Sequence, residues 1–142
     1  MAKIFLASDH AGFALKNHLV AYVSKLGHEV IDLGCHTEAS CDYPDYAHLA
    51  AEKILAESAL GILVCGSGVG ISIAANRHPG IRAVVCSEPF SSEMARRHND
   101  ANVLCMGSRV VGLGLAEKLA EAFLNATFEG GRHAGRVSKI EY

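Results

Sequence analysis

The segment Cys65-Gly66-Ser67-Gly68-Val69-Gly70 holds the residues with the clearest capacity for chemistry in this chain. It follows an apolar run and opens a helical pattern, so its glycines let backbone N–H groups converge at a helix N-terminus. Such a turn can hold a phosphate, or a negative oxygen that forms during a reaction. A plain strand-to-helix turn that needs small residues is the alternative. The spacing fits neither a dinucleotide fingerprint after the first strand nor a Walker A loop.

Cys65 stands at the end of the apolar run, directly before the expected helix N-terminus. That position favours the thiolate form of a cysteine, which is the reactive form. A buried, inert cysteine is the alternative, and it is the preferred interpretation of Cys86, whose Ser-Glu-Pro loop has no anion-binding glycines. The five cysteines contain no CxxC pair, which favours reduced intracellular thiols over a disulfide framework.

Asp9 and His10 are neighbours at the end of the first apolar run. An acid beside an imidazole can move hydroxyl protons and can bind sugar hydroxyls or a phosphate. A helix N-cap next to a surface histidine is the alternative. His98 closes a later helical pattern, where the helix dipole alone commonly stabilises a histidine. Asn99 would then be an ordinary left-handed residue just after that helix.

Arg132, His133 and Arg136 follow two glycines near the end of the sequence. Two guanidinium groups four residues apart can share one helical face and clamp one anion, because arginine suits bidentate phosphate contacts. A solvated basic surface is the alternative. The eight histidines are dispersed, and no set of His, Asp and Glu has ligand spacing, so we expect no metal. Together these candidates suit proton transfer next to a carbonyl on a small phosphorylated, polyhydroxylated substrate.

The elements that must position these residues alternate along the whole chain. Strands are expected at Ile4–Ser8, Glu29–Leu33, Leu60–Cys65, Ile81–Cys86 and Asn102–Met106. Helices are expected at Phe13–Leu26, Tyr46–Leu55 with an extra turn, Val69–Ala75, Ser87–His98 with Ser87 as N-cap, and Leu113–Asn125. This order predicts a three-layer α/β/α Rossmann-like fold with a five-stranded parallel sheet. In such folds, ligands bind at the carboxyl ends of the strands.

Composition narrows the classes of function further. The 142 residues are half apolar, and 13 basic against 15 acidic residues give a formal net charge of −2. These values predict one domain and supply no electrostatic reason to expect nucleic acid or an anionic membrane as a partner. The first apolar run is too short for a signal peptide, and no stretch approaches the ~18 apolar residues of a membrane helix. We therefore expect a cytoplasmic protein.

The chain resembles the ribose-5-phosphate isomerase B family, the RpiB/LacAB group of sugar-phosphate isomerases. The matching stretches are Ser8–Gly12, Asp42–Pro44, Cys65–Asn76, Gly80–Ala83, His98–Leu104 and Glu129–His133. They cover nearly the whole sequence in order and at fitting spacing, which makes the resemblance specific. One branch of the family has a glutamate base just after the glycine loop. Here that position is Ile71 and Cys65 is present, so the chain resembles the cysteine-type branch.

The resemblance implies an isomerase that interconverts D-ribose 5-phosphate and D-ribulose 5-phosphate, a step of the pentose phosphate pathway. The reaction would pass through an enediolate, without metal or organic cofactor. An isomerase of six-carbon sugar 6-phosphates, such as allose 6-phosphate, is the alternative. The family forms homodimers, often paired into tetramers, whose active sites combine two subunits. On that pattern residues 1–142 form a single isomerase domain, and residues 128–142 are a C-terminal extension that reaches the partner subunit.

The resemblance also implies catalytic roles for Cys65, Ser67, Asp9 and His98. Cys65 would be the base that moves the proton between C1 and C2, while Ser67 and the loop backbone hold the developing oxyanion. His98 would open the furanose ring with the help of Asp9. The implied substrate-binding residues are His10, Tyr43, Gly66, Gly68, Val69, Gly70, Asn99, Arg109, Arg132, His133 and Arg136.

Within that set, the resemblance implies that His10, Arg132 and Arg136 bind the phosphate, with Arg109 and His133 as helpers. Tyr43 would line the sugar pocket and Asn99 would bind sugar oxygens. His98, Asn99, Arg132 and Arg136 would face Cys65 of the partner subunit. Each site would therefore combine the glycine loop of one chain with the C-terminal residues of the other.

Overall fold

The computed structural model describes residues 2–141 and contains five strands and six helices within that range. The strands are β1 (Lys3–Ser8), β2 (Glu29–Asp32), β3 (Leu60–Cys65), β4 (Ala83–Val85) and β5 (Val103–Gly107). The helices are α1 (Phe13–Lys25), α2 (Tyr43–Glu57), α3 (Val69–Ala75), α4 (Pro89–Asn99), α5 (Leu113–Asn125) and α6 (Arg132–Ile140). All strand pairs are parallel, in the order β2-β1-β3-β5-β4. This confirms the predicted five-stranded parallel α/β fold.

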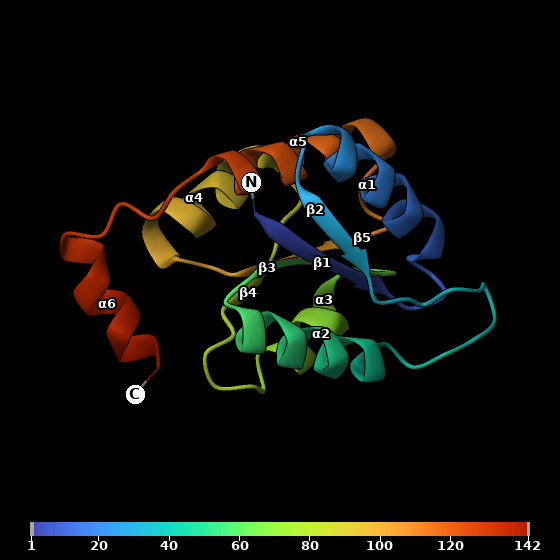
Figure 1. Ribbon diagram of the computed structural model, residues 1–142, viewed down its shortest axis with the longest axis horizontal. Helices are drawn as coiled ribbons and strands as arrows, with labels where there is room; N and C mark the ends of the chain where they lie inside the picture. Colours follow the sequence, from blue (N-terminus) through green and yellow to red (C-terminus); the bar gives the residue numbers. More distant parts are fainter. Residues whose placement is uncertain (1, 142) are drawn as a thin grey trace.

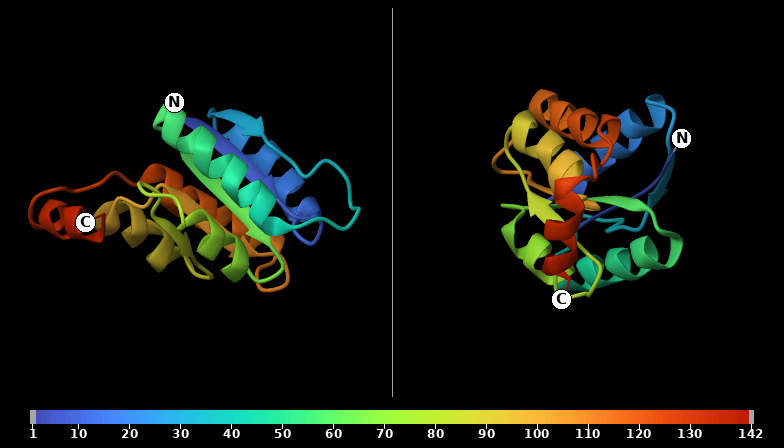
Figure 2. Two further views of the ribbon diagram at one scale, coloured as in Figure 1. Left: turned by 90° about the horizontal axis from the view of Figure 1, so that it is seen from below. Right: turned by 90° about the vertical axis from the view of Figure 1, so that its left-hand side faces the viewer.

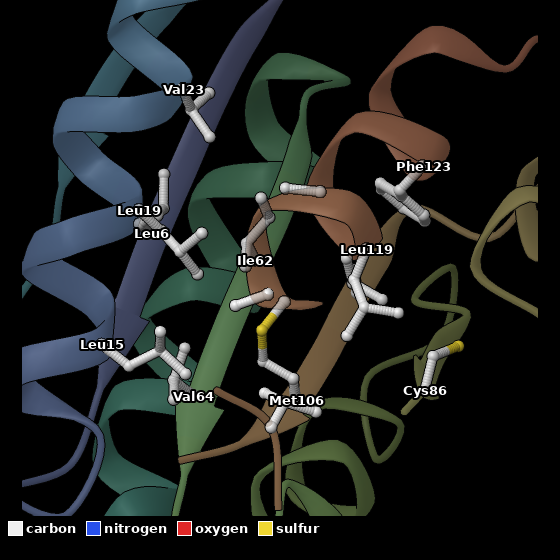
Figure 3. Close-up of a cluster of buried hydrophobic side chains, with 14 of the residues drawn as sticks. Leu6, Leu15, Leu19, Val23, Ile62, Val64, Cys86, Met106, Leu119 and Phe123 are labelled. Atoms are coloured by element: carbon white, nitrogen blue, oxygen red, sulfur yellow. The ribbon is translucent and has the colours of Figure 1, made fainter. Parts of the chain in front are cut away.

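The sheet lies between two layers of helices, with α1, α4 and α5 on one face and α2 and α3 on the other (Figures 1 and 2). Alternate residues of β1 point to opposite faces: Ile4 and Leu6 pack with α1 and α5, whereas Phe5 and Ala7 pack with α2 and α3. Figure 3 shows the first of these two cores, with Phe123 of α5 at its edge. Burial of each large apolar side chain in this way stabilises the folded chain by about 1.5–3 kcal/mol relative to exposure.

Two details at the ends of α4 differ from the sequence expectation. The N-cap is Glu88 rather than Ser87, because the ring of Pro89 suits the first helical position and the Glu88 carboxylate accepts the Ser91 N–H at 3.0 Å. This hydrogen bond lowers the pKa of Glu88. The left-handed residue after the helix is Asp100, with φ of 47°, rather than Asn99. Its carboxylate accepts a hydrogen bond from Arg96.

The C-terminal residues form a helix that the strand-and-helix pattern did not assign. Helix α6 has no buried residue and lies beyond α4, at the end of the molecule far from the loop between β2 and α2 (Figure 1). Because it adds no side chain to either core, the stability of the sheet does not depend on its apolar packing. Among the described residues, none of the helices is long and apolar enough to span a membrane.

The strand order places a reversal in the middle of the sheet. The chain leaves β2, passes over β1 and returns as β3 on its other side. At such a point the loops after adjacent strands diverge and leave a crevice at the carboxyl edge. Asp9 directly follows β1 and Cys65 is the last residue of β3. Because β1 and β3 are neighbours in the sheet, the strand order brings these two residues together.

Candidate active site

A cavity of about 530 Å³ lies at the carboxyl ends of β1, β3 and β5, and we call it the glycine-loop cavity. Its lining residues are Asp9, His10, Ala11, Tyr43, Cys65, Gly66, Ser67, Val69, Gly70, Arg109 and Val110. Nine of them were expected from the sequence as site residues, and only Ala11 and Val110 were not. The crevice predicted from the strand order is therefore the place where the chemical groups of one chain meet.

The sulfur of Cys65 sits in this cavity under the start of α3. The side chain is 4% exposed, and Sγ accepts the backbone N–H of Gly68 at 3.2 Å. Gly68 has a φ of 81°, and a Cβ there would lie 2.7 Å from the Met106 carbonyl carbon, so only glycine fits. An amide that points at sulfur next to a helix N-terminus stabilises negative charge on that sulfur.

Two larger side chains lie directly on the glycine loop. A Cβ built on Gly66 would come within 2.9 Å of the Arg109 guanidinium, and one on Gly70 within 2.6 Å of the Tyr43 ring. The same loop is tied to the end of β5, since the Arg109 N–H donates to the Gly66 carbonyl at 3.0 Å. The missing side chains therefore let Arg109 and Tyr43 close over the loop.

Asp9 and His10 form the opposite wall, after β1. Asp9 is 6% exposed, and its Oδ1 accepts the N–H of Gly12 at 3.0 Å, which orients the carboxylate. His10 is half-buried, and its Nδ1 accepts the backbone N–H of Cys41 at 3.2 Å. The sequence carries no signal for this last contact, because it joins the backbone of one loop to a side chain 31 residues away.

The remaining predicted residues lie elsewhere in this chain. We call His98, Asn99 and residues 129–140 the α6 region. Within residues 2–141, none of its members lines the glycine-loop cavity. Asn99 instead borders a separate hollow of about 580 Å³ beside β4. The α6 region lies at the opposite end of the molecule from the β2–α2 loop, near the end of α4 (Figures 1 and 2).

Three side chains of the α6 region, those of His98, Glu129 and His133, lie close to one another. The rings of His98 and His133 stack at 4.3 Å with an interplanar angle of 11°, and Oε1 of Glu129 lies 3.7 Å from Nε2 of each. Arg97 holds the other carboxylate oxygen at 2.6 Å, which lowers the pKa of Glu129. Burial, followed by the neighbouring charges of His98 and Arg132, lowers the pKa of His133.

The group His98, Glu129 and His133 is the one set of three such side chains, in the part of the chain described, that could share an ion. The nearly parallel rings work against this, because an ion in the plane of one ring would lie outside the plane of the other. One imidazole would have to turn before both could bind. The expectation that the chain needs no metal stays a prediction.

Three of the other four cysteines are buried, as the sequence interpretation of Cys86 expected. Among residues 2–141 all five cysteines are free thiols, and Cys35, Cys86 and Cys105 are buried. Burial raises the pKa of Cys86 to about 11, and it raises that of the wholly buried Cys105 as well. Neither sulfur lines the glycine-loop cavity. Cys65 is thus distinguished by its cavity and by the amide that faces it.

Comparisons with known proteins identify the family of the chain. A family model described as ribose/galactose isomerase matches residues 4–140. The ribose-5-phosphate isomerase B of Escherichia coli is 54% identical over 141 residues, covering 99% of this chain and 95% of the relative. The solved structure of the Clostridium thermocellum ribose-5-phosphate isomerase B is 50% identical, with a TM-score of 0.95, and covers 98% of this chain and 95% of that one.

A third relative shows what such a fold can hold. The structure of the Mycoplasma genitalium ribose-5-phosphate isomerase B contains bound ribulose 5-phosphate. It is 43% identical, with a TM-score of 0.93, and covers 97% of this chain and 93% of that one. The match to the family extends over almost all of the sequence and includes the glycine loop and the residues of α6. The chain therefore belongs to the ribose/galactose isomerase family.

Proposed function

We propose that this protein interconverts D-ribose 5-phosphate and D-ribulose 5-phosphate. The observation that carries the proposal is the Cys65 sulfur, which lies in the glycine-loop cavity and accepts the Gly68 N–H at 3.2 Å. Named relatives at high identity and coverage are ribose-5-phosphate isomerases, and one of them holds ribulose 5-phosphate. These relatives do not favour the alternative, an isomerase of six-carbon sugar 6-phosphates.

In the proposed mechanism, the Cys65 thiolate removes the proton from C2 of the open-chain aldose. The electron pair of the broken C–H bond forms the enediolate double bond, and the negative charge moves to the C1 oxygen. The first amides of α3 have no partner within the helix, and with the Ser67 hydroxyl they would stabilise this oxygen. A proton then passes from the C2 hydroxyl to the C1 oxygen, which moves the negative charge to the C2 oxygen. The Cys65 thiol returns its proton to C1 as the C2 carbonyl forms, so the reaction needs no cofactor.

The other cavity residues would bind and orient the sugar phosphate. His10 and Arg109 face the same cavity and would hold the phosphate. Asp9, oriented by the Gly12 amide, would accept a sugar hydroxyl proton during ring opening. Tyr43, which lies against Gly70, would form the wall along the sugar chain.

We further propose a cytoplasmic homodimer with shared active sites. His98, Asn99, Arg132, His133 and Arg136 lie away from the cavity of their own chain, so a second copy would have to supply them. Exposed apolar side chains support such an interface, and two of them, Val69 and Val110, line the cavity. The exposed side chains are Val69, Ile73, Val85, Phe90, Val110 and Leu113, and they are 45–71% exposed. Residues 128–142, of which the last lies outside the described residues, would then be the extension that reaches the partner.

A coupled assay tests the reaction. Ribose 5-phosphate should be isomerised with a kcat/KM far above that for allose 6-phosphate. In D₂O, NMR should show solvent deuterium entering the substrate at C2. A protein that binds ribose 5-phosphate without this exchange would be a sugar-phosphate sensor, and the proposed activity would be wrong.

Mixed subunits test the shared site. Cys65→Ala and His98→Ala chains should each be inactive alone. After random mixing, half of the dimers would carry one intact site, and about a quarter of wild-type activity should return. The matched control mixes Cys65→Ala with Asp9→Asn. Both changes then fall in the cavity half of the site, so no intact site can form and no activity should return. Equal recovery in both mixtures, or in neither, would contradict the arrangement.

A further inference from the structure

We infer that the backbone amide of Cys41 fixes the ring tautomer of His10, and that Lys16 is a positioning residue that holds the loop carrying this amide. The inference rests on the proposed function only in its last step, in which His10 binds the substrate phosphate. The tautomer and the role of Lys16 follow from contacts within one chain and can be measured without substrate.

The contact at His10 determines where its proton lies. The Cys41 amide can only donate, and it points at Nδ1 of His10 at 3.2 Å, so Nδ1 must present a lone pair. The proton of the neutral ring is then on Nε2. The Cys41 sulfur lies 4.0 Å from the same nitrogen. Because burial raises the pKa of the Cys41 thiol, this sulfur is not a negative acceptor that would draw a proton onto Nδ1.

The loop that carries Cys41 runs from β2 to α2 and has a buried anchor near its start. Residues 36–40 are exposed, whereas Gly34 and Cys35 are buried against the end of β1. The Ser8 N–H donates to the Gly34 carbonyl at 2.7 Å, and the Cys35 N–H donates to the Ser8 carbonyl at 2.9 Å. The Cys41 amide lies six residues after this anchor and two before α2, so a displacement of the anchored start would shift the amide.

Lys16 of α1 holds that start from inside the protein. Its side chain is 1% exposed, and Nζ donates three hydrogen bonds of 2.9 Å, to Asn17 Oδ1, Asp32 Oδ2 and the Cys35 carbonyl. All three ammonium donors are thus used. The other oxygen of Asp32 accepts the Gly34 N–H at 2.9 Å. Because a buried ammonium is tolerated only when it is fully paired, this arrangement resists displacement of the loop.

The chemical consequence concerns the anion that His10 would bind. A ring with its proton on Nε2 presents an N–H donor to a phosphate oxygen, whereas the other tautomer would present a lone pair and repel it. A phosphate far from C1 and C2 is bound equally in the ground state and the transition state. Disturbing the tautomer should therefore raise KM and leave kcat nearly the same.

Nitrogen-15 NMR of the substrate-free protein tests the first part. Long-range correlations from the ring protons of His10, assigned with a His10→Gln variant, should show hydrogen on Nε2 and a lone pair on Nδ1. Cys41→Pro removes the amide hydrogen and should give a mixture of tautomers, while Cys41→Ala keeps the amide and should keep the tautomer. Hydrogen on Nδ1 in the wild type, or the same tautomer in Cys41→Pro, would overturn the inference.

The double variant Lys16→Met/Asp32→Asn tests the second part. It removes both charges of the pair, so it avoids the unpaired carboxylate that could unfold Lys16→Met alone. The side-chain amide oxygen that replaces the carboxylate can still accept the Gly34 N–H. With its fold verified by circular dichroism, this variant should show faster exchange of the Cys41 amide, mixed His10 tautomers and a KM raised about tenfold. Lys118→Met, at a lysine whose side chain is 68% exposed, is the control.

Three outcomes separate this inference from the proposed function. If Lys16→Met/Asp32→Asn retains the wild-type tautomer and exchange rate, Lys16 does not position the loop, whatever the enzyme does. If His10→Gln leaves the KM for ribose 5-phosphate unaltered, His10 does not bind the phosphate, and the proposed role of this residue fails while the NMR result stands. A wild-type tautomer with a normal KM in Cys41→Pro would contradict the inference alone.

Discussion

In the glycine-loop cavity, Cys65 and Asp9 are 4% and 6% exposed, whereas no residue of helix α6 is buried. The cavity is built from the ends of strands that sit between two layers of packed side chains. The α6 region is held mainly by polar contacts, among them Arg97 to Glu129 at 2.6 Å. Exposed pairs of this kind contribute little to folding stability.

This difference in burial indicates that the cavity and the α6 region have different roles in the proposed site. A base that must meet a C–H bond needs a fixed position in a protected cavity, which buried strand ends supply. Groups that reach toward a second chain must instead stand clear of their own core. The α6 region meets that need, since it presents Arg132 and Arg136 to solvent at the far end of the molecule.

Replacing Cys65 should have the largest effect. Cys65→Ala should lower kcat by about 10²- to 10⁴-fold, which is the usual contribution of a general base. The matched control is Cys86→Ala, at a buried cysteine outside the cavity. Both proteins should remain folded, and steady-state assays with ribose 5-phosphate measure the result. Similar activity in the two variants would remove the distinction between Cys65 and the structural cysteines.

Replacing an arginine of α6 should have the next largest effect. Arg136→Met should raise KM for ribose 5-phosphate by about 10- to 100-fold, since a hydrogen bond to a charged group contributes about 1.5–3 kcal/mol. The unfolding midpoint in urea should not move, because α6 adds nothing to the core. Lys139→Met on the same helix is the control. A large loss of stability in Arg136→Met would mean that α6 is part of the folded core after all.

Alkylation of the native protein should separate the cysteines by rate. With the pKa of Cys86 at about 11, only about one in a thousand of its thiols is ionised at pH 8. Cys65 should therefore react with iodoacetamide before Cys86 and Cys105, and ribose 5-phosphate should slow it. Peptide mass spectrometry gives the order. Labelling of Cys86 first would show that the buried sulfur of the cavity is not the reactive one.

The pH dependence of stability should give the smallest effect. The pKa of His133 is lowered in the folded chain, so the unfolded chain binds this proton more readily. Stability should then fall as the pH drops through the ordinary imidazole value of about 6.5. His133→Gln should flatten this slope in urea titrations between pH 7.5 and pH 5.5, measured at roughly unit intervals. An unaltered slope in His133→Gln would show that a group other than His133 causes the pH dependence of stability.

Local sequence patterns were enough to predict much of the fold and the residues of the glycine-loop cavity. The alternation of apolar runs and helical stripes predicted all five strands, because period and burial are encoded over a few neighbouring residues. Element ends were less certain: α4 begins at Pro89 with Glu88 as N-cap, since a proline ring and a carboxylate outcompete the Ser87 hydroxyl there. Helix α6 was not assigned from the sequence, because this short segment contains glycine and charged residues and buries no apolar side chain.

The sequence by itself determined the parallel α/β fold, the glycine loop with Cys65 before a helix, and the membership of a sugar-phosphate isomerase family. Only the tertiary structure decided that His98 and Arg136 stand apart from the cavity, that Lys16 is buried with three partners, and that the Cys41 amide meets His10. A motif consists of residues that are close together in the sequence, so it can be recognised without the structure. Contacts between distant residues depend on the path of the whole chain through space, which no local pattern records.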